Sequence, residues 1–355
     1  MKYGIMIGRF QPIHNGHLKA IQHALEEECE KIIIFITGTN RPRSSENPFT
    51  GQERQTMIEE SLIDFFEDRA KTPTGWTDSP HKFEILDRVK IKTVRDLYYS
   101  DQRWANEIIA EAVALGVPEN SQTKLITSVQ HPFKENKNLF PHWKLFTTPE
   151  YDHQLRGEQI RAAMFDPKTK VFSVTQSVEE FIESFYHTKD FEDLKSGYDF
   201  EKNYKEAWEC APHVPIHVTV DSIVLCNGTI LLVKRKMNPG KGLYALPGGF
   251  AKHDLSIYDG AIKEIDEETN LRIPKNRLKG FLKEVKIFDH VKRDPRGRVI
   301  THVHLFNIES KTLPEIKAGD DAKEAHWVSF HKIWEMSNVM FRDHWDIIVQ
   351  MTAGH

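Results

Sequence analysis

The stretch GRFQPIHNGH, from Gly8 to His17, follows the short apolar run Tyr3–Ile7. The run is typical of a buried strand, and a helix is predicted from about Gly16 to Glu28. In a loop between such a strand and helix, free backbone N–H groups and the positive end of the helix face any bound anion. Gly8 and Gly16 let the backbone approach that anion closely. The stretch therefore predicts a phosphate-binding loop.

The sequence around this loop predicts the sheet that holds it. The run Ile32–Ile36 is continuously apolar, as in a parallel sheet covered on both faces. Further strands are predicted at Ile85–Val94, Lys124–Val129 and Lys144–Phe146, with helices at about 50–67, 103–115 and 157–165. This alternation predicts an α/β domain with a Rossmann-like, doubly wound parallel sheet.

A length of 355 residues predicts two domains. After Pro215 the pattern changes to β, and a hairpin is predicted from His217–Cys226 and Thr229–Lys236 across the turn dipeptide Asn227-Gly228. The intervening residues are rich in charged and aromatic side chains and predict helix. We therefore predict a first domain over 1–180, a helical connector over 181–211 and a second domain over 212–355.

The composition excludes several classes of protein. The net charge of −4 argues against a strongly basic nucleic-acid-binding surface. No apolar run approaches the ~20 residues of a membrane span, and the start is too short and interrupted for a signal peptide. Cys29, Cys210 and Cys226 lack metal-ligand spacing and fit a reducing cytoplasm. We expect small-molecule partners, with no nucleic acid and no membrane, and the sequence leaves a homo-oligomer open.

His14 and His17 lie three residues apart at the predicted helix start, where both can donate hydrogen bonds to one phosphoryl group. Arg9 adds a planar guanidinium suited to phosphate oxygens. Two surface histidines at a helix cap are the alternative. In its strand–loop–helix context, however, the stretch resembles the HxGH signature of the nucleotidyltransferase superfamily, which transfers nucleotidyl groups to phosphate-bearing acceptors.

Two further segments strengthen this resemblance. Glu46–Arg54, ENPFTGQER, is similar to a stretch of archaeal-type nicotinamide mononucleotide (NMN) adenylyltransferases. It also fits a helix start in which Thr50 and Glu53 form a capping box, and a structural ion pair would explain Arg54 equally well. Leu155–Arg161 matches the second phosphate motif of the family, although Arg156 and Glu158 replace its usual hydroxyl residues.

The resemblance implies a set of site residues. Asp96 and Trp104 match the residues that line the nicotinamide pocket in the family, and an indole can stack on a pyridinium ring; a core aromatic is the alternative for Trp104. The resemblance implies adenylyl transfer from ATP to NMN, with catalysis by His14, His17 and Arg161. It assigns ATP and NMN binding to Gly8, Arg9, Phe10, Gly16, Asp96, Trp104 and Gly157.

A second motif lies near residue 260. Glu264, Glu267 and Glu268 are spaced i, i+3 and i+4 on a predicted helix and share one face. Carboxylates so close repel one another unless a cation lies between them, and their hard oxygens suit Mg²⁺ or Mn²⁺. A solvated acidic face is the alternative.

Together with Leu246–Phe250, LPGGF, this helix resembles the Nudix box. Three box positions differ, because Leu255 replaces a glutamate, Lys263 an arginine and Asn270 a glycine. The resemblance implies a C-terminal Nudix α/β/α sandwich in which Glu264, Glu267 and Glu268 bind the metal, with Glu267 and Glu268 catalytic.

The pairing of the two domains resembles the bacterial bifunctional family of NMN adenylyltransferase/ADP-ribose pyrophosphatases. That family implies synthesis of NAD at one site and cleavage of ADP-ribose to AMP and ribose 5-phosphate at the other. Two alternatives stay open. The second domain could be a non-hydrolysing nucleotide sensor, as the loss of a carboxylate at Leu255 suggests. The transferase could instead use another acceptor, such as a pantetheine phosphate or flavin mononucleotide.

Overall fold

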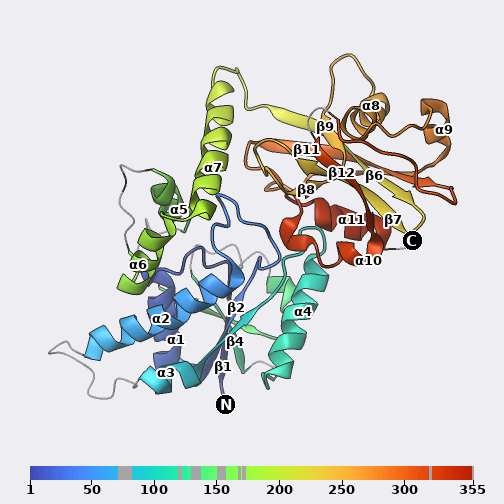
Figure 1. Cartoon of the computed structure of the whole chain (residues 1–355). Helices are drawn as coiled ribbons and strands as arrows, with labels where there is room; N and C mark the ends of the chain where they lie inside the picture. Colours follow the sequence, from blue (N-terminus) through green and yellow to red (C-terminus); the bar gives the residue numbers. More distant parts are fainter. Residues whose placement is uncertain are drawn as a thin grey trace. The chain divides into compact units, whose positions relative to one another are not determined.

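The computed structural model describes residues 1–70, 82–118, 122–128, 137–149, 157–166, 169, 173–319 and 322–353. Contacts between residues divide the chain into two compact units, Met1–Lys195 and Ser196–His355. The division falls inside helix α7 (Lys189–Ala207), within the residues predicted as a connector (Figure 1). Each unit is described separately.

The first unit is built on a five-stranded parallel sheet. Its strands are β1 (Tyr3–Gly8), β2 (Lys31–Ile36), β3 (Val89–Thr93), β4 (Thr123–Ser128) and β5 (Lys144–Thr148). They lie in the order β3-β2-β1-β4-β5, and every neighbouring pair is parallel. The predicted doubly wound fold is confirmed. The chain passes from β1 to β2 on one side, and β4 joins on the other, so the carboxyl end of β1 lies at the switch point where such sheets bind ligands.

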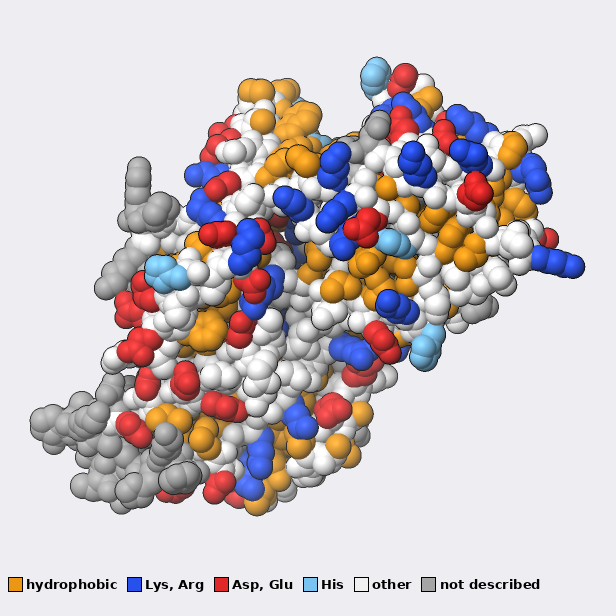
Figure 2. All heavy atoms as spheres, in the orientation of Figure 1, with side chains coloured by type: hydrophobic (Ala, Val, Ile, Leu, Met, Phe, Trp, Pro, Cys, Tyr) orange, Lys and Arg blue, Asp and Glu red, His pale blue; other side chains and the backbone are white. Residues whose placement is uncertain are grey.

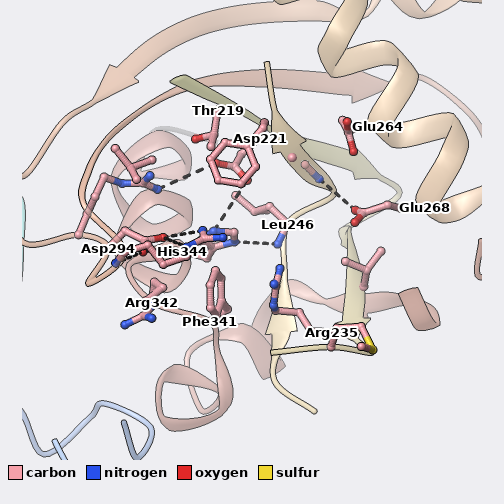
Figure 3. A pocket seen from close by; sticks show the side chains of 18 of the residues that line it. Thr219, Asp221, Arg235, Leu246, Glu264, Glu268, Asp294, Phe341, Arg342 and His344 are labelled. Carbon is pink, nitrogen blue, oxygen red and sulfur yellow. Dashed lines mark hydrogen bonds and ion pairs between the residues drawn. The ribbon is translucent and has the colours of Figure 1, made fainter. Parts of the chain in front are cut away.

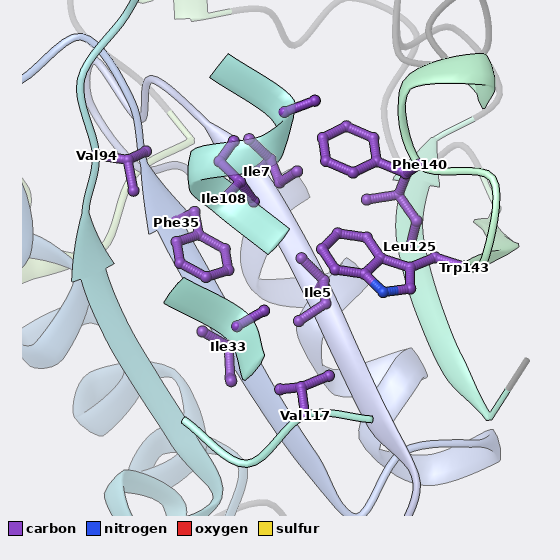
Figure 4. Close-up of a cluster of buried hydrophobic side chains, with 12 residues drawn as sticks. Ile5, Ile7, Ile33, Phe35, Val94, Ile108, Val117, Leu125, Phe140 and Trp143 are labelled. Carbon is purple, nitrogen blue, oxygen red and sulfur yellow. The ribbon is translucent and has the colours of Figure 1, made fainter. Parts of the chain in front are cut away.

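Helices cover this sheet and complete its core. They are α1 (Asn15–Glu27), α2 (Gly51–Ala70), α3 (Lys82–Arg88), α4 (Asp101–Ala114), α5 (Gly157–Phe165) and α6 (Gln176–Phe185), with a short 3-10 turn at Lys137–Leu139. One cluster packs strand residues such as Ile5 and Phe35 against Ile108 of α4, beside the stacked rings of Phe140 and Trp143 (Figure 4). The continuous apolar runs of the sequence are the buried strands.

One predicted element was partly wrong. The expected strand Ile85–Val94 begins only at Val89, because the preceding residues form helix α3. Ile85 and Val89 are both buried and lie four residues apart, which is the spacing of one helical face. Arg88 donates to the carbonyls of Leu25 and Cys29, at the end of α1. The apolar spacing of the run Ile85–Val94 fits both a strand and one face of a helix, so the sequence alone did not distinguish helix α3 from strand β3.

The second unit contains a seven-stranded mixed sheet. Its strands are β6 (Ile216–Cys226), β7 (Thr229–Arg235), β8 (Tyr244–Ala245), β9 (Gly248–Phe250), β10 (Leu282–Phe288), β11 (Arg298–Ile308) and β12 (Ala322–Ser329). The main order is β10-β11-β6-β7-β12; β8 pairs with β7, and β9 with β6. The hairpin predicted across Asn227-Gly228 is confirmed, and both turn residues have positive φ, 46° and 71°.

Helices α8 (Ile257–Thr269), α9 (Lys275–Gly280), α10 (Phe330–Ile333) and α11 (His344–Thr352), with a 3-10 turn at Ser337–Val339, accompany this sheet. Basic and acidic side chains are interspersed on the face of the molecule seen in Figure 2. Among the described residues, no helix has the length and apolar character needed to span a membrane.

Candidate active sites

The predicted phosphate loop lies between β1 and α1. His14 is the N-cap of α1, and the rings of His14 and His17 stand with their centroids 3.7 Å apart. The backbone N–H of His14 donates to Nδ1 of His17 over 3.3 Å. Because Nδ1 accepts, the neutral ring of His17 carries its proton on Nε2. The structure thus brings both predicted histidines together at a helix N-terminus.

Arg54 holds the backbone around this loop. It is fully buried and donates to the carbonyls of Arg9 and Thr37 at 2.6 Å each, and to those of Gly38 and Thr50 at longer range. Burial lowers the pKa of Arg54 to about 10, so the side chain stays charged at neutral pH. The geometry supports a structural role for Arg54, because its guanidinium binds backbone carbonyls and is closed to solvent.

Gln11 connects the phosphate loop to the ENPFT segment. Its buried amide donates to the Phe49 carbonyl at 2.7 Å, accepts from the Phe49 N–H at 3.0 Å, and also contacts the side chain of Asn47. The predicted capping box is confirmed, since Thr50 N–H donates to Glu53 and Glu53 N–H to Thr50 Oγ1. Sequence reasoning missed this role of Gln11, although the residue lies inside the quoted motif.

Four other predicted residues gather near the loop. Arg9 Nη2 lies 3.6 Å from Asp96 Oδ2, and Arg161 Nη1 donates to the Gln11 carbonyl at 2.9 Å. A Cβ on Gly157 would stand 3.2 Å from Arg161 Nη1, so a glycine leaves room for that guanidinium. The guanidinium groups of Arg9 and Arg161 thus place permanent positive charge near the carboxyl end of β1.

The remaining predicted residues of this unit differ in their surroundings. Gly8 passes close to the Phe10 ring, which lies edge-on to His17 with 4.9 Å between centroids, and Gly16 belongs to the first turn of α1. Trp104 is half-buried on α4, edge-to-face with Phe140. Arg156 lies outside the described residues.

The second candidate site is a pocket of about 320 Å³ in the second unit (Figure 3). Glu264 and Glu268 of α8 lie on one side of it, and Asp294, Arg342 and His344 lie opposite. Its lining is strongly charged, with acidic Asp221, Glu264, Glu268 and Asp294 and basic Arg235, Lys236, Lys252, Arg293, Arg296 and Arg342.

Glu264 and Glu268 form the acidic wall. They are 7% and 9% exposed, and Glu268 accepts from the Gly248 N–H at 3.0 Å. Burial raises the pKa of Glu268 to about 8, and the neighbouring charge of Glu264 adds to the rise. Burial also raises the pKa of Glu264, although Lys252 Nζ lies 3.1 Å from it. Two desolvated carboxylates this close are suited to share a divalent cation.

The glycines of LPGGF are required by this packing. A Cβ on Gly248 would stand 2.3 Å from the Val220 carbonyl oxygen, and one on Gly249 would stand 2.7 Å from Glu264 Oε2. The turn therefore approaches both the sheet and the acidic wall more closely than any side chain allows.

The third predicted carboxylate lies apart from this pair. Glu267 is 44% exposed and pairs with Lys263 at 3.4 Å, so the structure brings together two of the three glutamates. Among the described residues, no group of three or more His, Cys, Asp or Glu side chains is arranged to hold a metal ion. Leu255 lies in the turn before α8 and does not line the pocket, whereas Lys252 does.

The change at Asn270 is explained directly. Asn270 ends α8 in the left-handed conformation, with φ 45° and ψ 37°, and its side chain donates to the Lys317 carbonyl at 2.9 Å. Asparagine tolerates this conformation better than other residues with a Cβ, so it can replace the glycine of the box.

Sequence reasoning missed the wall opposite α8. Arg293 binds Asp343 through two hydrogen bonds of 2.9 and 3.1 Å. His344 accepts from the Leu246 N–H at 2.9 Å, and its Nε2 lies 3.8 Å from Asp221 Oδ1. Burial lowers the pKa of His344, which keeps the ring neutral. The only signal in the sequence was a charged residue, Asp221, inside the apolar strand His217–Cys226.

Comparison with known proteins adds to this geometry. Residues 5–101 match the cytidylyltransferase-like family and residues 215–348 the NUDIX domain. A bifunctional NMN adenylyltransferase/ADP-ribose pyrophosphatase from Francisella tularensis, crystallised with AMP and a manganese ion, is 31% identical over 99% of both chains, with a TM-score of 0.87. The chain belongs to this bifunctional family.

Two shorter relatives of this bifunctional chain resemble its parts. An ADP-ribose pyrophosphatase from Methanocaldococcus jannaschii is 42% identical over 116 residues, which are 33% of this chain and 63% of that protein. A nicotinamide/nicotinic acid mononucleotide adenylyltransferase from Acinetobacter baylyi is 27% identical over 197 residues, 55% of this chain and 93% of that protein. Each partial relative carries one of the two activities in its name.

Proposed function

We propose that the chain synthesises NAD from NMN and ATP at the first site and hydrolyses ADP-ribose to AMP and ribose 5-phosphate at the second. The observation that carries this proposal is the similarity to the Francisella enzyme along 99% of both chains, because it includes both sites at once. A relative of only one domain would support only one activity.

At the first site, the 5′-phosphate of NMN attacks the α-phosphorus of ATP, the bond to the β-phosphate breaks, and pyrophosphate leaves. Catalysis of this kind depends on positioning and on neutralising charge. His17, with its proton on Nε2, and His14 beside it would donate to the transferring phosphoryl group. Arg9 and Arg161 would neutralise the polyphosphate, with Gly8, Phe10, Gly16 and Gly157 shaping the loop.

The acceptor end of the site would include Asp96 and Trp104. Asp96 is held in place by Asn40, which accepts from the Asp96 N–H at 2.8 Å and donates to its carbonyl at 3.2 Å. Its carboxylate pairs with Arg9, so the ends of β1 and β3 are connected where the two substrates would meet. In this proposal, the indole of Trp104 would stack on the positively charged nicotinamide ring.

At the second site, Glu264 and Glu268 would hold Mg²⁺ or Mn²⁺, as the buried pair of carboxylates fits. A bound divalent cation neutralises diphosphate oxygens and acidifies water. Arg235 and Arg342 would bind the phosphates of ADP-ribose across the pocket. Glu267 is proposed as a further catalytic carboxylate, and its ion pair with Lys263 must open before it can reach the pocket.

An acceptor panel tests the transferase. The full chain is incubated with ATP and Mg²⁺ and, separately, NMN, its deamido acid, phosphopantetheine or flavin mononucleotide, and pyrophosphate release is measured. We expect rapid release with NMN and its loss in His14→Ala. Faster turnover with the flavin or pantetheine phosphate would contradict the assignment.

The alternative of a sensor domain has one observation in its favour, because Lys252 pairs with Glu264 in a box that lacks its first glutamate. Metal-dependent release of AMP from ADP-ribose would exclude it. We also propose a cytoplasmic location, with which the three free cysteines agree.

A further inference from the structure

Lys252 lies against the acidic wall of the second pocket. It follows β9 by two residues, lines the pocket and places its Nζ 3.1 Å from Glu264 Oε1. The side chain of Glu264 is 9% exposed, whereas that of Lys252 is 39% exposed. A buried carboxylate is thus neutralised by a lysine whose own side chain still reaches solvent.

The backbone on either side of Lys252 is held in place. The Ala251 N–H donates to the Val218 carbonyl at 2.9 Å, which continues the pairing of β9 with β6. On the other side, the Leu255 N–H donates to the Lys252 carbonyl at 3.4 Å. The four-carbon stem of a lysine is flexible, in contrast, and can carry the ammonium to a new position. The structure therefore fixes where the side chain begins and leaves its charged end able to move.

The carboxylate of Glu264 is more tightly confined than its partner. A Cβ on Gly249 would stand 2.7 Å from Glu264 Oε2 and 3.0 Å from Oε1, so the backbone of the LPGGF turn packs directly against this group. Glu268, one turn later on α8, is held by the Gly248 N–H at 3.0 Å. When the ion pair of Lys252 and Glu264 opens, it is therefore the lysine that leaves.

One oxygen of Glu264 is needed by two cations. Divalent cations bind carboxylate oxygens directly, and Oε1 is the atom that Lys252 contacts. The ammonium also cancels part of the negative charge that Glu264 and Glu268 offer to a metal, and it repels a second cation. Binding of a divalent cation at Glu264 therefore requires that the ammonium be displaced.

We propose that Lys252 is an exchangeable counter-ion of the acidic wall, which neutralises Glu264 until a divalent cation displaces it. Lys252 thereby weakens metal binding and makes the loading of the second site depend on the concentration of free divalent cation. The inference rests on the proposed function, because it takes Glu264 and Glu268 as the residues that hold the metal. It gives a residue outside α8 control over whether the site is loaded.

The test measures Mn²⁺ binding to the full chain without ADP-ribose, from the electron paramagnetic resonance signal of free Mn²⁺ at constant pH. Lys252→Met and Lys252→Gln remove the charge, and Lys252→Arg keeps it. Lys236→Met is the matched control, because Lys236 is an exposed lysine in the lining of the same pocket. The double variant Glu264→Gln/Glu268→Gln identifies the ions bound at this site. Lys252→Met and Lys252→Gln should lower the Kd for Mn²⁺ by about tenfold, whereas Lys252→Arg and Lys236→Met should change it by less than about twofold.

Unchanged or weaker Mn²⁺ binding in both Lys252→Met and Lys252→Gln would overturn the inference. An equal gain in Lys236→Met would overturn it too, because it indicates a general effect of the charge of the pocket. Since no substrate is added, the result is separate from hydrolysis. If Lys252→Met binds Mn²⁺ more tightly but the wild type releases no AMP from ADP-ribose, the proposed hydrolysis fails and the role of Lys252 stands.

Discussion

The phosphate loop of the first unit and the pocket of the second unit are both charged sites, but they are built in different ways. In the loop, the buried polar side chains of Gln11 and Arg54 bind backbone groups, so one short segment is held in a ligand-ready shape. In the pocket, side chains such as Asp221, Arg293 and His344 face one another from segments far apart in the chain. In the first site one short motif carries both histidines, and side chains from other segments hold its backbone. In the second site the charged groups themselves come from several segments.

This difference predicts how each site responds to change. A loop whose two histidines lie in one short motif should lose its activity through single residues of that motif. An assembled pocket should depend on pairs, because each buried charge is neutralised by a partner from another element.

The largest effect is expected for His17→Ala. Removing a donor to the transferring phosphoryl should lower the kcat of NAD synthesis by about 10²–10³-fold and change the KM for ATP much less. Hydrolysis of ADP-ribose should be unchanged, and His23→Ala, on the same helix, serves as the control. Survival of kcat would remove His17 from the mechanism.

The second largest effect is expected for Glu268, and it should distinguish this residue from its neighbour Glu267. Glu268→Gln should lower ADP-ribose hydrolysis by about a hundredfold or more, because Glu268 lines the pocket beside Glu264. Glu267→Gln should cost less, since this side chain lies outside the acidic wall. Initial rates at several Mn²⁺ concentrations measure both, and equal losses would mean that α8 presents Glu267 when metal binds.

Arg54→Met tests the hydrogen bonds by which Arg54 holds the backbone around the phosphate loop of the first unit. Loss of its hydrogen bonds to buried carbonyls should lower the free energy of unfolding by about 2 kcal/mol. The urea concentration that abolishes NAD synthesis should fall, whereas that for ADP-ribose hydrolysis should stay constant. If both activities fail together, the two units do not unfold independently.

The smallest effect concerns pH and His344. Burial lowers its pKa in the folded chain, so below about pH 6.5 the unfolded state takes up a proton that the folded state does not. Stability should therefore fall as the pH drops from 7 toward 5, and fall less steeply in His344→Gln. Thermal unfolding followed by loss of ADP-ribose hydrolysis measures the slope, and identical slopes would show that His344 is protonated in the folded pocket.

The sequence predicted what short segments specify. The paired histidines, the capping box of Thr50 and Glu53 and the hairpin at Asn227-Gly228 depend on neighbours within a few residues. The pair of Asp343 and Arg293 could not be found in this way, because the residues lie 50 positions apart and meet only through the fold. The strand predicted from Ile85 failed because its apolar spacing also suits a helix.

The central claim is that one chain carries two independent activities. The most direct measurement incubates the full chain with ADP-ribose and Mn²⁺, beside Glu267→Gln/Glu268→Gln, and quantifies AMP while NAD synthesis from NMN and ATP is followed in both. We predict AMP from the wild type, none from the double variant, and equal NAD synthesis in the two. Intact NAD synthesis without AMP from the wild type would contradict the account and leave the second unit as a domain that does not hydrolyse ADP-ribose.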